Sequence, residues 1–202
     1  CREEYEEPAD RRYHAQAIAC PDCGPTLSLA EPDGTDRDVD DPVATAGERL
    51  LDGEILAVKG IGGAHLVCDA TDPAAVWRLR ERTGRPRKPF ALMAPSLDAV
   101  RSFAAVDDAE RAALEDVRRP IVLLEQRDAP WLDAVAPALH TVGIMLPYAG
   151  LHHLLFDAVE RPLVMTSANR PGRPMCTDRE SMVAQLREAV DGLLVHDREI
   201  VA

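Results

Sequence analysis

The sequence predicts an α/β domain with a covered sheet at residues 41–202, preceded by a polar segment of different character at residues 1–40. Short apolar runs bounded by glycine, proline or charged residues alternate with longer helical stretches in the second part. Hydrophobic residues make up 46% and charged residues 29% of the chain, as in globular domains rather than disordered or fibrous chains. The 202 residues are enough for one well-buried domain and too few for two full ones.

The predicted elements begin at Asp41-Pro42, where an N-cap residue precedes proline at the first helical position. The apolar run at 54–58 predicts a buried strand, and a glycine-rich turn at 60–63 separates it from a second apolar run at 65–68. Asp72-Pro73 repeats the capping pattern and opens a helix to about residue 82. The later elements are, in order, a strand at 89–93, a helical stretch at about 96–117, strands at 120–124 and 142–146, a helix near 151–159, a strand at 162–167, a helix at about 179–190 and a strand at 192–196.

The polar first segment carries a cysteine pattern typical of half a zinc site. Cys20 and Cys23 form a C-x-x-C pair, a spacing that suits two thiolate ligands of tetrahedral Zn²⁺. Cys1 has the spacing of the other half, and the fourth position is left to water, His14 or no group. We expect a structural zinc here, because the segment is too polar to pack by itself. Both ends of the chain look cut, which leads us to expect a module of a longer polypeptide.

Charge and cysteine content exclude several classes of protein. The 23 basic and 35 acidic residues give a net charge of −12, which argues against broad attachment to nucleic acid or anionic lipid. No apolar run is long enough to span a bilayer, and the acidic start is unlike a secretory leader. Five cysteines are too few for a disulfide scaffold, so a reducing, cytoplasmic location is expected, with Cys68 and Cys176 as buried spectators.

The densest positive charge lies at 78–88, where six cations accompany one acid, Glu81. Such a run fits either a solvated helix face or an anion site. Its second half favours a site, because prolines stiffen the segment R-P-R-K-P-F and a predicted strand follows, and α/β domains bind ligands at sheet edges. Guanidinium and ammonium groups suit polyphosphate or carboxylate. We therefore predict Arg85 and Lys88 as catalytic and Arg82 as phosphate-binding.

Two other predicted strand ends carry groups that could bind phosphate. Lys59 ends the strand before the glycine-rich turn, where the backbone can approach a ligand closely. The segment T-S-A-N-R-P-G at 166–172 ends another strand, and its hydroxyl and amide groups can donate to phosphate or ribose. Each turn alone is more often only a turn, but three in one small domain predict a shared anion site. The candidates are catalytic Lys59 and the binding residues Thr166, Ser167, Asn169 and Arg170.

Three histidines have alternative interpretations. We predict that His65, which follows the glycine turn, lines the ligand site; the alternative is a buried, hydrogen-bonded histidine. His152 and His153 lie in an apolar predicted helix, where adjacent side chains point about 100° apart, so both cannot belong to the core. One of this pair near the ligand is left open.

Five stretches in this order resemble the YrdC-like domain, and most closely the version found in the HypF carbamoyltransferases of [NiFe]-hydrogenase maturation. Ser167-Ala168-Asn169 matches the S-x-N part of the K-x-R…S-x-N signature of YrdC proteins. Arg85 matches the arginine of K-x-R, but Thr83 stands where lysine is usual, and Arg82 or Lys88 is left to replace it. The five stretches are EYxxPxDRRYHAQxxxCPDCGP at 4–25, KGIGGAHLVCDA at 59–70, RPRKPFALM at 85–93, GIMLPYAGLHHLLF at 143–156 and TSANRPG at 166–172.

The resemblance implies a twisted open sheet with helices around a central cationic cavity. It also implies synthesis of carbamoyl-adenylate from ATP, with Mg²⁺, and a carbamoyl group derived from carbamoyl phosphate. An upstream acylphosphatase domain, a downstream Kae-like domain and the partner HypE belong to the same implied pathway. Such a reaction depends on positioning and charge neutralisation rather than on a protein nucleophile.

Three alternatives remain at this point. Related YrdC proteins use threonine, bicarbonate and ATP to make threonylcarbamoyl-adenylate for tRNA modification, but the cysteine pattern and the L-H-H-L-L-F stretch favour HypF. An RNA-binding module is the second alternative, which the net charge of −12 and the low aromatic content of 4% weaken. A scaffold that joins catalytic neighbours is the third.

Overall fold

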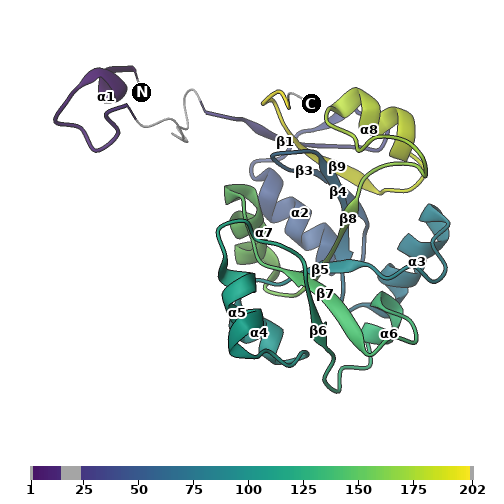
Figure 1. The fold of residues 1–202 in the computed structure, drawn as a ribbon. Coiled ribbons are helices and arrows are strands. Elements are labelled where there is room, and N and C mark those ends of the chain that lie inside the picture. Colours follow the sequence, from purple (N-terminus) through teal and green to yellow (C-terminus); the bar gives the residue numbers. More distant parts are fainter. Residues whose placement is uncertain (1, 15–23, 201–202) are drawn as a thin grey trace.

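The structure is a computed structural model that describes residues 2–14 and 24–200 (Figure 1). The helices are α1 (Arg2–Glu6), α2 (Pro42–Leu51), α3 (Pro73–Thr83), α4 (Leu97–Arg101), α5 (Asp108–Glu115), α6 (Leu132–Val135), α7 (Gly150–Val159) and α8 (Arg179–Leu186). The strands are β1 (Leu27–Ala30), β2 (Asp36–Arg37), β3 (Leu56–Lys59), β4 (Ala64–Asp69), β5 (Ala91–Met93), β6 (Val122–Glu125), β7 (Thr141–Met145), β8 (Leu163–Ser167) and β9 (Gly192–His196).

The strands form one mixed sheet in the order β2-β1-β9-β3-β4-β8-β5-β7-β6. β3 pairs with β9 and β5 pairs with β7 in parallel, whereas the other neighbours are antiparallel. The predicted α/β class with an open sheet is therefore confirmed. Within the described ranges, no helix has the length and apolar character needed to cross a membrane.

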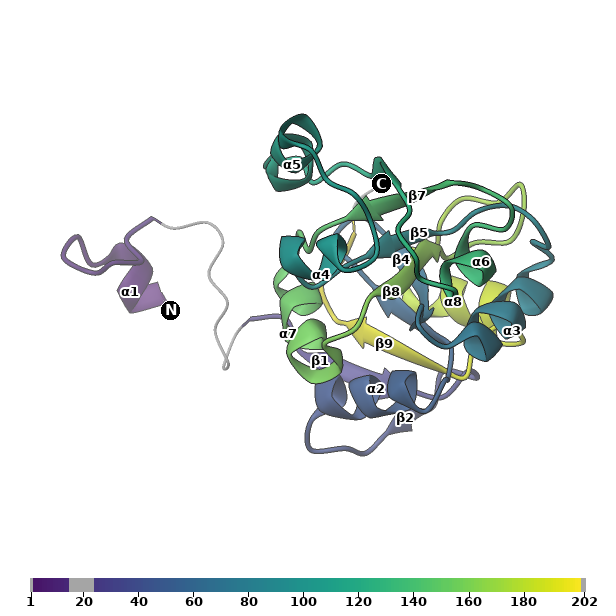
Figure 2. The same cartoon turned by 90° about the horizontal axis from the view of Figure 1, so that it is seen from below.

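Helices cover both faces of the sheet (Figure 2). On one face, α2 and α7 pack against strand residues such as Val58 and Val67. On the other, α3, α6 and α8 contribute to a larger cluster that includes Leu66 and Val164. We call these the α2–α7 face and the α3–α8 face. Because successive strand residues alternate between faces, β4 directs His65 toward the α2–α7 face and Leu66 toward the α3–α8 face.

Helix α3 delivers the cationic segment to its place. The side chain of Asp72 accepts a hydrogen bond from the backbone N–H of Ala74 at 2.9 Å, and Pro73 begins the helix. Gly84 ends it in the left-handed conformation with φ 63°, which glycine adopts without the steric cost of a Cβ. The chain thus leaves the helix immediately before Arg85, as the predicted change from helix to stiff loop requires.

Several local predictions differ from the structure. The stretch at 96–117 is two helices, because Ala104 forms an isolated bridge with Gln126 and Asp107 opens α5 with a capping box that includes Glu110. Helix α8 ends at Leu186 rather than near residue 190. The short helix α6 and the strands β1 and β2 had no recognised sequence signal.

Strands β1 and β2 extend the sheet into the polar segment at residues 1–40, for which the sequence predicts a zinc site. β1 pairs antiparallel with β9, and Leu29 and Ala30 are fully buried. Residues from 27 onward therefore contribute to the core of the sheet. The division of the chain at residue 40 stays a prediction, and residues 2–14, which contain α1, form hydrogen bonds among themselves.

Candidate functional site

The strand register brings most of the predicted site residues to one edge of the sheet. In the antiparallel pair β3–β4, Lys59 pairs with Ala64, and in β4–β8, His65 pairs with Ser167. β5 runs antiparallel to β8, so its N-terminal end lies at the same edge, and that end follows the loop at 85–88. The three strand ends that the sequence singled out therefore lie at one edge of the sheet.

One side-chain contact joins two of these signals directly. Arg85 Nη1 donates to Thr166 Oγ1 at 2.9 Å, which ties the 85–88 loop to the end of β8. Thr166 pairs in register with Leu66, so its side chain lies on the α3–α8 face, whereas Ser167 lies with His65 on the α2–α7 face. Arg85 is half-buried and Lys88 is exposed. Cationic and hydroxyl groups thus meet at the rim of the sheet.

Arg80 is the largest departure from the sequence interpretation. It is one of the six cations at 78–88, for which the sequence suggests a solvated helix face or an anion site, yet it is 2% exposed. The guanidinium carbon lies 4.4 Å from the ring centroid of Phe90 and 5.6 Å from that of Trp77. A signal existed in the sequence: residue 80 falls one helical turn after the buried Val76, on the apolar face of α3. A charge count alone could not separate this arginine from its neighbours.

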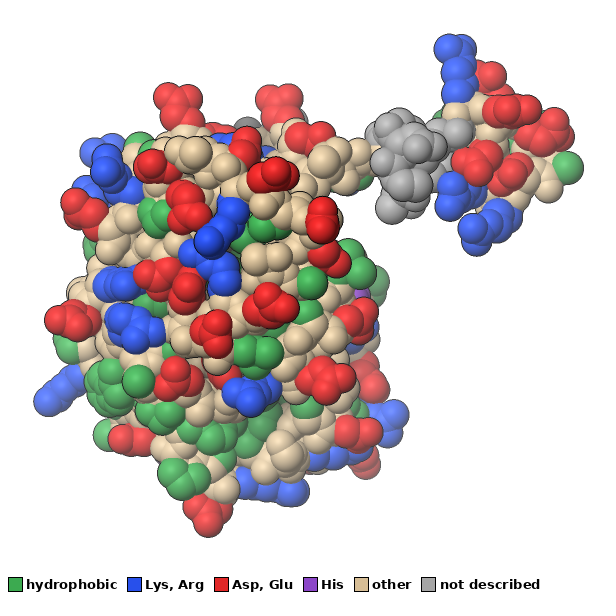
Figure 3. Space-filling model, turned by 180° about the vertical axis from the view of Figure 1, so that it is seen from behind, with side chains coloured by type: hydrophobic (Ala, Val, Ile, Leu, Met, Phe, Trp, Pro, Cys, Tyr) green, Lys and Arg blue, Asp and Glu red, His purple; other side chains and the backbone are tan. Residues whose placement is uncertain are grey.

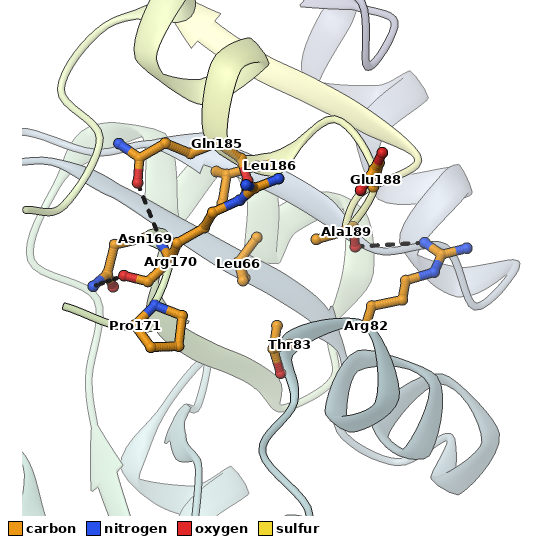
Figure 4. A pocket seen from close by; sticks show the side chains of 10 residues that line it. All are labelled: Leu66, Arg82, Thr83, Asn169, Arg170, Pro171, Gln185, Leu186, Glu188 and Ala189. Carbon is orange, nitrogen blue, oxygen red and sulfur yellow. Dashed lines mark hydrogen bonds between the residues drawn. The ribbon is translucent and has the colours of Figure 1, made fainter. Parts of the chain in front are cut away.

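A small hollow of about 90 Å³ lies between α3, α8 and the turn at 169–172 (Figure 4). Arg82 and Arg170 lie on opposite sides of it, with Leu66 between them. Both guanidinium groups already have partners: Arg82 Nη1 contacts Asp191 Oδ1 at 2.8 Å, and Arg170 Nε donates to the backbone carbonyl of Gln185 at 2.9 Å. Any anion here would compete with these contacts.

Asn169 lines the same hollow, but its side-chain amide donates its hydrogen bonds within its own turn. Its Nδ2 donates to the carbonyls of Arg170 at 3.2 Å and Arg173 at 2.8 Å. Its Oδ1 is buried and has no hydrogen-bond partner among the described residues. The free group of Asn169 is therefore an acceptor, suited to a ribose hydroxyl or an amino group rather than to a phosphate oxygen.

Lys59 lies at the same sheet edge but in a different hollow of about 530 Å³, which Ser28 and Arg179 also line. The lysine is 6% exposed, and its Nζ donates to the carbonyls of His196 at 3.1 Å and Arg198 at 2.7 Å. Arg179 Nη1 contacts Asp36 at 2.7 Å. Lys59 and the residues around Asn169 therefore line two separate hollows. The single cationic cavity implied by the resemblance stays a prediction.

The three histidines differ in how deeply their side chains are buried. His152 is 1% exposed, and burial, with smaller contributions from His65 and His153, lowers its pKa to about 4. Its Nδ1 has no hydrogen-bond partner in the part of the chain that the structure describes, and its ring lies 4.4 Å from the ring of Tyr148 in an edge-on arrangement. Burial also lowers the pKa of His65, which is half-buried. His153 is exposed, so the expectation that the adjacent pair cannot both be core is confirmed.

The predicted zinc ligands Cys1, Cys20 and Cys23 lie outside the described residues. Among the described residues, no group of three or more histidine, cysteine or acidic side chains has the arrangement of a metal site. Cys68 and Cys176 are buried free thiols, and burial raises the pKa of each. Both agree with the prediction of unreactive core cysteines.

Comparison with known proteins places this geometry in a family. A model of the Sua5, YciO and YrdC family, described as telomere recombination, matches residues 48–202. The chain belongs to the Sua5/YciO/YrdC family. A HypF finger model matches residues 1–30, which contain all three predicted zinc ligands.

Individual HypF proteins resemble the chain over nearly its whole length. Carbamoyltransferase HypF from Rhodobacter capsulatus is 51% identical over 200 residues, covering 99% of this chain and 26% of that protein. The crystal structure of T. kodakarensis HypF matches all of the chain with 46% identity and a TM-score of 0.93. A crystal structure of full-length HypF in the phosphate- and nucleotide-bound form matches it with 40% identity and a TM-score of 0.90. The chain spans about a quarter of the length of these family members, and the resemblance to HypF is confirmed.

A second branch of the family is more distant. A threonylcarbamoyl-AMP synthase of Xanthomonas euvesicatoria is 29% identical over 165 residues, covering 78% of this chain and 84% of that protein. The chain is therefore less similar to this branch than to the HypF proteins.

Proposed function

We propose that this chain makes carbamoyl-adenylate from ATP and a carbamoyl group derived from carbamoyl phosphate, as one module of a longer HypF-type carbamoyltransferase. The supporting observation is the Arg85–Thr166 contact, which joins the 85–88 loop to the S-x-N strand end at one edge of the sheet. A full-length HypF structure that matches the whole of this chain is in a phosphate- and nucleotide-bound form, which supports a nucleotide as a ligand of such proteins.

The reaction needs little from the protein beyond position and charge. A carbamate oxygen forms a bond to the α-phosphorus of ATP, the bond from that phosphorus to the bridging oxygen breaks, and pyrophosphate leaves with the electron pair. Arg85 and Lys88 neutralise charge on the phosphate oxygens, and Ser167 orients the anion from the opposite face. Asn169 accepts from a nucleotide hydroxyl or amino group through its free Oδ1. Mg²⁺ would be held largely by the nucleotide phosphates and water, and it would supply positive charge to the pyrophosphate oxygens.

The replacement of the usual lysine by Thr83 has a local explanation. Thr83 Oγ1 donates back to the carbonyl of Leu79 at 2.6 Å, so this side chain is turned toward its own helix. Arg82 Nη1 is paired with Asp191, so a phosphate at Arg82 would compete with this ion pair. Lys88, exposed on the neighbouring loop, is the cation that we assign to the missing position.

The deciding experiment is ATP-dependent release of pyrophosphate by the 202-residue chain with Mg²⁺. Carbamoyl phosphate and carbamate are compared with threonine plus bicarbonate as co-substrates. We expect release with carbamate, release with carbamoyl phosphate only as far as it is first hydrolysed to carbamate, and none with threonine plus bicarbonate. Activity with the second pair alone would replace the proposed substrate by that of the threonylcarbamoyl-AMP synthases, which the 29% identity to one such enzyme makes the second candidate.

RNA binding receives no support from the visible charge distribution. On the face in Figure 3, acidic and basic side chains are intermixed rather than gathered by sign. RNA affinity that falls steeply with salt would support an RNA-binding module, and no binding at about 50 mM salt would exclude it.

The N-terminal segment and the wider assembly complete the proposal. Cys1, Cys20 and Cys23 would hold a structural Zn²⁺, for which three thiolates are fitting ligands, and the HypF finger match to residues 1–30 supports this assignment. Measuring zinc per chain in the protein and in a Cys20→Ser variant tests it; equal zinc content in both would exclude Cys20 as a ligand. Acylphosphatase and Kae-like domains and the acceptor HypE would supply the carbamoyl group and take up the product.

A further inference from the structure

Arg80 is a buried cation whose hydrogen bonds all go to backbone carbonyls. Its Nε donates to Ala134 at 2.7 Å and its Nη2 to Val135 at 2.8 Å, both at the C-terminal end of α6. Its Nη1 donates to the carbonyls of Arg85 at 2.8 Å and Lys88 at 2.9 Å. One guanidinium therefore links the two ends of the 85–88 loop to a helix end on the other side of it.

Burying the charged guanidinium of Arg80 costs free energy, so we ask what the charge contributes. Burying a cation that no carboxylate neutralises has a desolvation cost. Packing against Phe90 and Trp77 does not require the charge, because an apolar side chain of similar volume could contact the same rings. Among the ion pairs of the described residues, Arg80 takes part in none. The charge and the forked donors need another explanation than packing.

We propose that Arg80 is the positioning residue of the 85–88 loop. It fixes the loop carbonyls from the inside, so that the side chains of Arg85 and Lys88 leave the loop on the ligand side, and its charge adds to the positive potential behind them. This role rests on the proposed function, because it assumes that the loop binds the phosphates of a nucleotide.

The local backbone agrees with a loop held at fixed points. Phe90 N–H donates to the carbonyl of Val135 at 3.0 Å, and Arg85 N–H donates to the carbonyl of Arg80 at 3.0 Å. These bonds fix the two ends of the loop. Between them the chain depends on Arg80, since the carbonyls of Arg85 and Lys88 are both its acceptors.

Arg80→Lys is the sharpest variant, because it keeps the charge and removes the fork. An ammonium group has three donors on a single nitrogen and cannot reach four carbonyls in this planar arrangement. We expect the KM for ATP to rise at least about tenfold, with kcat within about threefold of wild type. Arg78→Lys is the matched control: Arg78 lies on the same helix and donates to the carbonyl of Gly53, away from the loop. It should leave the KM unchanged.

A second readout reports the loop without any activity. Trypsin does not cleave before proline, so Arg85-Pro86 and Lys88-Pro89 resist it and Arg87–Lys88 is the susceptible bond of the loop. In Arg80→Lys and Arg80→Met we expect faster cleavage at this bond than in the wild type and in Arg78→Lys. ATP should slow the cleavage in the wild type. Circular dichroism on each variant verifies that the domain is folded.

The two readouts separate the two hypotheses. If the wild type binds no ATP, the proposed function fails, while the rate of cleavage at Arg87–Lys88 still decides whether Arg80 orders the loop. If the folded Arg80→Lys protein retains both the wild-type KM and the wild-type cleavage rate, the positioning role is wrong. An equal rise in KM in Arg78→Lys would also overturn it, because the effect would then be general to α3.

Discussion

Two buried cations lie at or near the same edge of the sheet, and they are arranged differently. Arg80 uses four of its five N–H donors on backbone carbonyls and packs against Phe90. Lys59 uses two of its three on the carbonyls of His196 and Arg198, and its hollow has a volume of about 530 Å³. Neither has a carboxylate partner among the ion pairs of the described residues.

The difference teaches how to tell a positioning cation from a binding one. Arg80 has nearly exhausted its donors and is enclosed, so it acts on the chain around it. Lys59 keeps one donor and borders open space, so it can exchange its contacts for those of an anionic ligand. Asp178 and Asp197 limit this capacity: the charge of Lys59 contributes to the lowered pKa of Asp178, and Asp197 lines the same hollow.

The largest expected effect tests this difference through stability. Arg80→Met should lower the free energy of unfolding by about 3–5 kcal/mol, because four carbonyls lose their donor. Lys59→Met should lower it by about 1–3 kcal/mol, since only two carbonyls are affected and water can reach the hollow. Urea unfolding of both variants measures the two changes. Equal losses would mean that the enclosed and the open cation are energetically alike.

The next largest effect concerns the titration of a buried histidine on the α2–α7 face. The pKa of His152 is lowered from its ordinary value of 6.5 to about 4, so the unfolded chain binds more protons than the folded one between these values. Stability should therefore fall as the pH drops from about 6.5 to 4, by on the order of 3 kcal/mol for this group. His65, whose pKa is also lowered, acts in the same direction.

His152→Leu provides the comparison for that pH dependence. Urea unfolding at several pH values between 4 and 6.5 should give a smaller slope for this variant than for the wild type. Identical slopes would mean that His152 does not stay neutral in the folded state at these pH values.

The next prediction concerns the 85–88 loop. Its expected effect in free energy is smaller, but it is the most direct test of function. Arg85→Ala and Lys88→Ala should each slow adenylation by more than about tenfold, or about 1.4 kcal/mol, without loss of the fold. Arg101→Ala, which removes an exposed arginine paired with Asp98 on α4, controls for the change in charge. Near-normal rates in both loop variants would remove the 85–88 loop from the site.

The smallest effect tests the start of the loop. Gly84→Ala should destabilise the domain by about 1 kcal/mol, because a Cβ disfavours the left-handed conformation even though space around it is open. Gly84→Asn should cost less, since asparagine tolerates this conformation better. Thermal unfolding distinguishes the two, and an unchanged midpoint for Gly84→Ala would show that the helix end can rearrange.

Much of the fold followed from local patterns. Asp41 and Asp72 before proline marked two helix starts, and short apolar runs marked seven of the strands that the structure contains. β1 was not predicted although the turn signal Pro32-Asp33-Gly34 follows it closely, because its four residues, L-S-L-A, are a very short apolar run inside a mainly polar segment. The break between α4 and α5 was not predicted, because it depends on the bridge from Ala104 to Gln126, which is a tertiary contact. The strand ends at Lys59, Arg85 and Thr166 were candidates because each chemical group sits next to a turn.

By itself the sequence determined which elements exist, which residues could meet an anion and which family the chain resembles, because helix caps, apolar periodicity and motifs are local in the chain. Only the tertiary structure decided what each cation does. Strand order brought Arg85 to Thr166, helix packing turned Arg80 inward, and Arg82 pairs with Asp191. A charge has the same sign wherever it lies, but its partners and its burial depend on contacts between residues far apart in sequence.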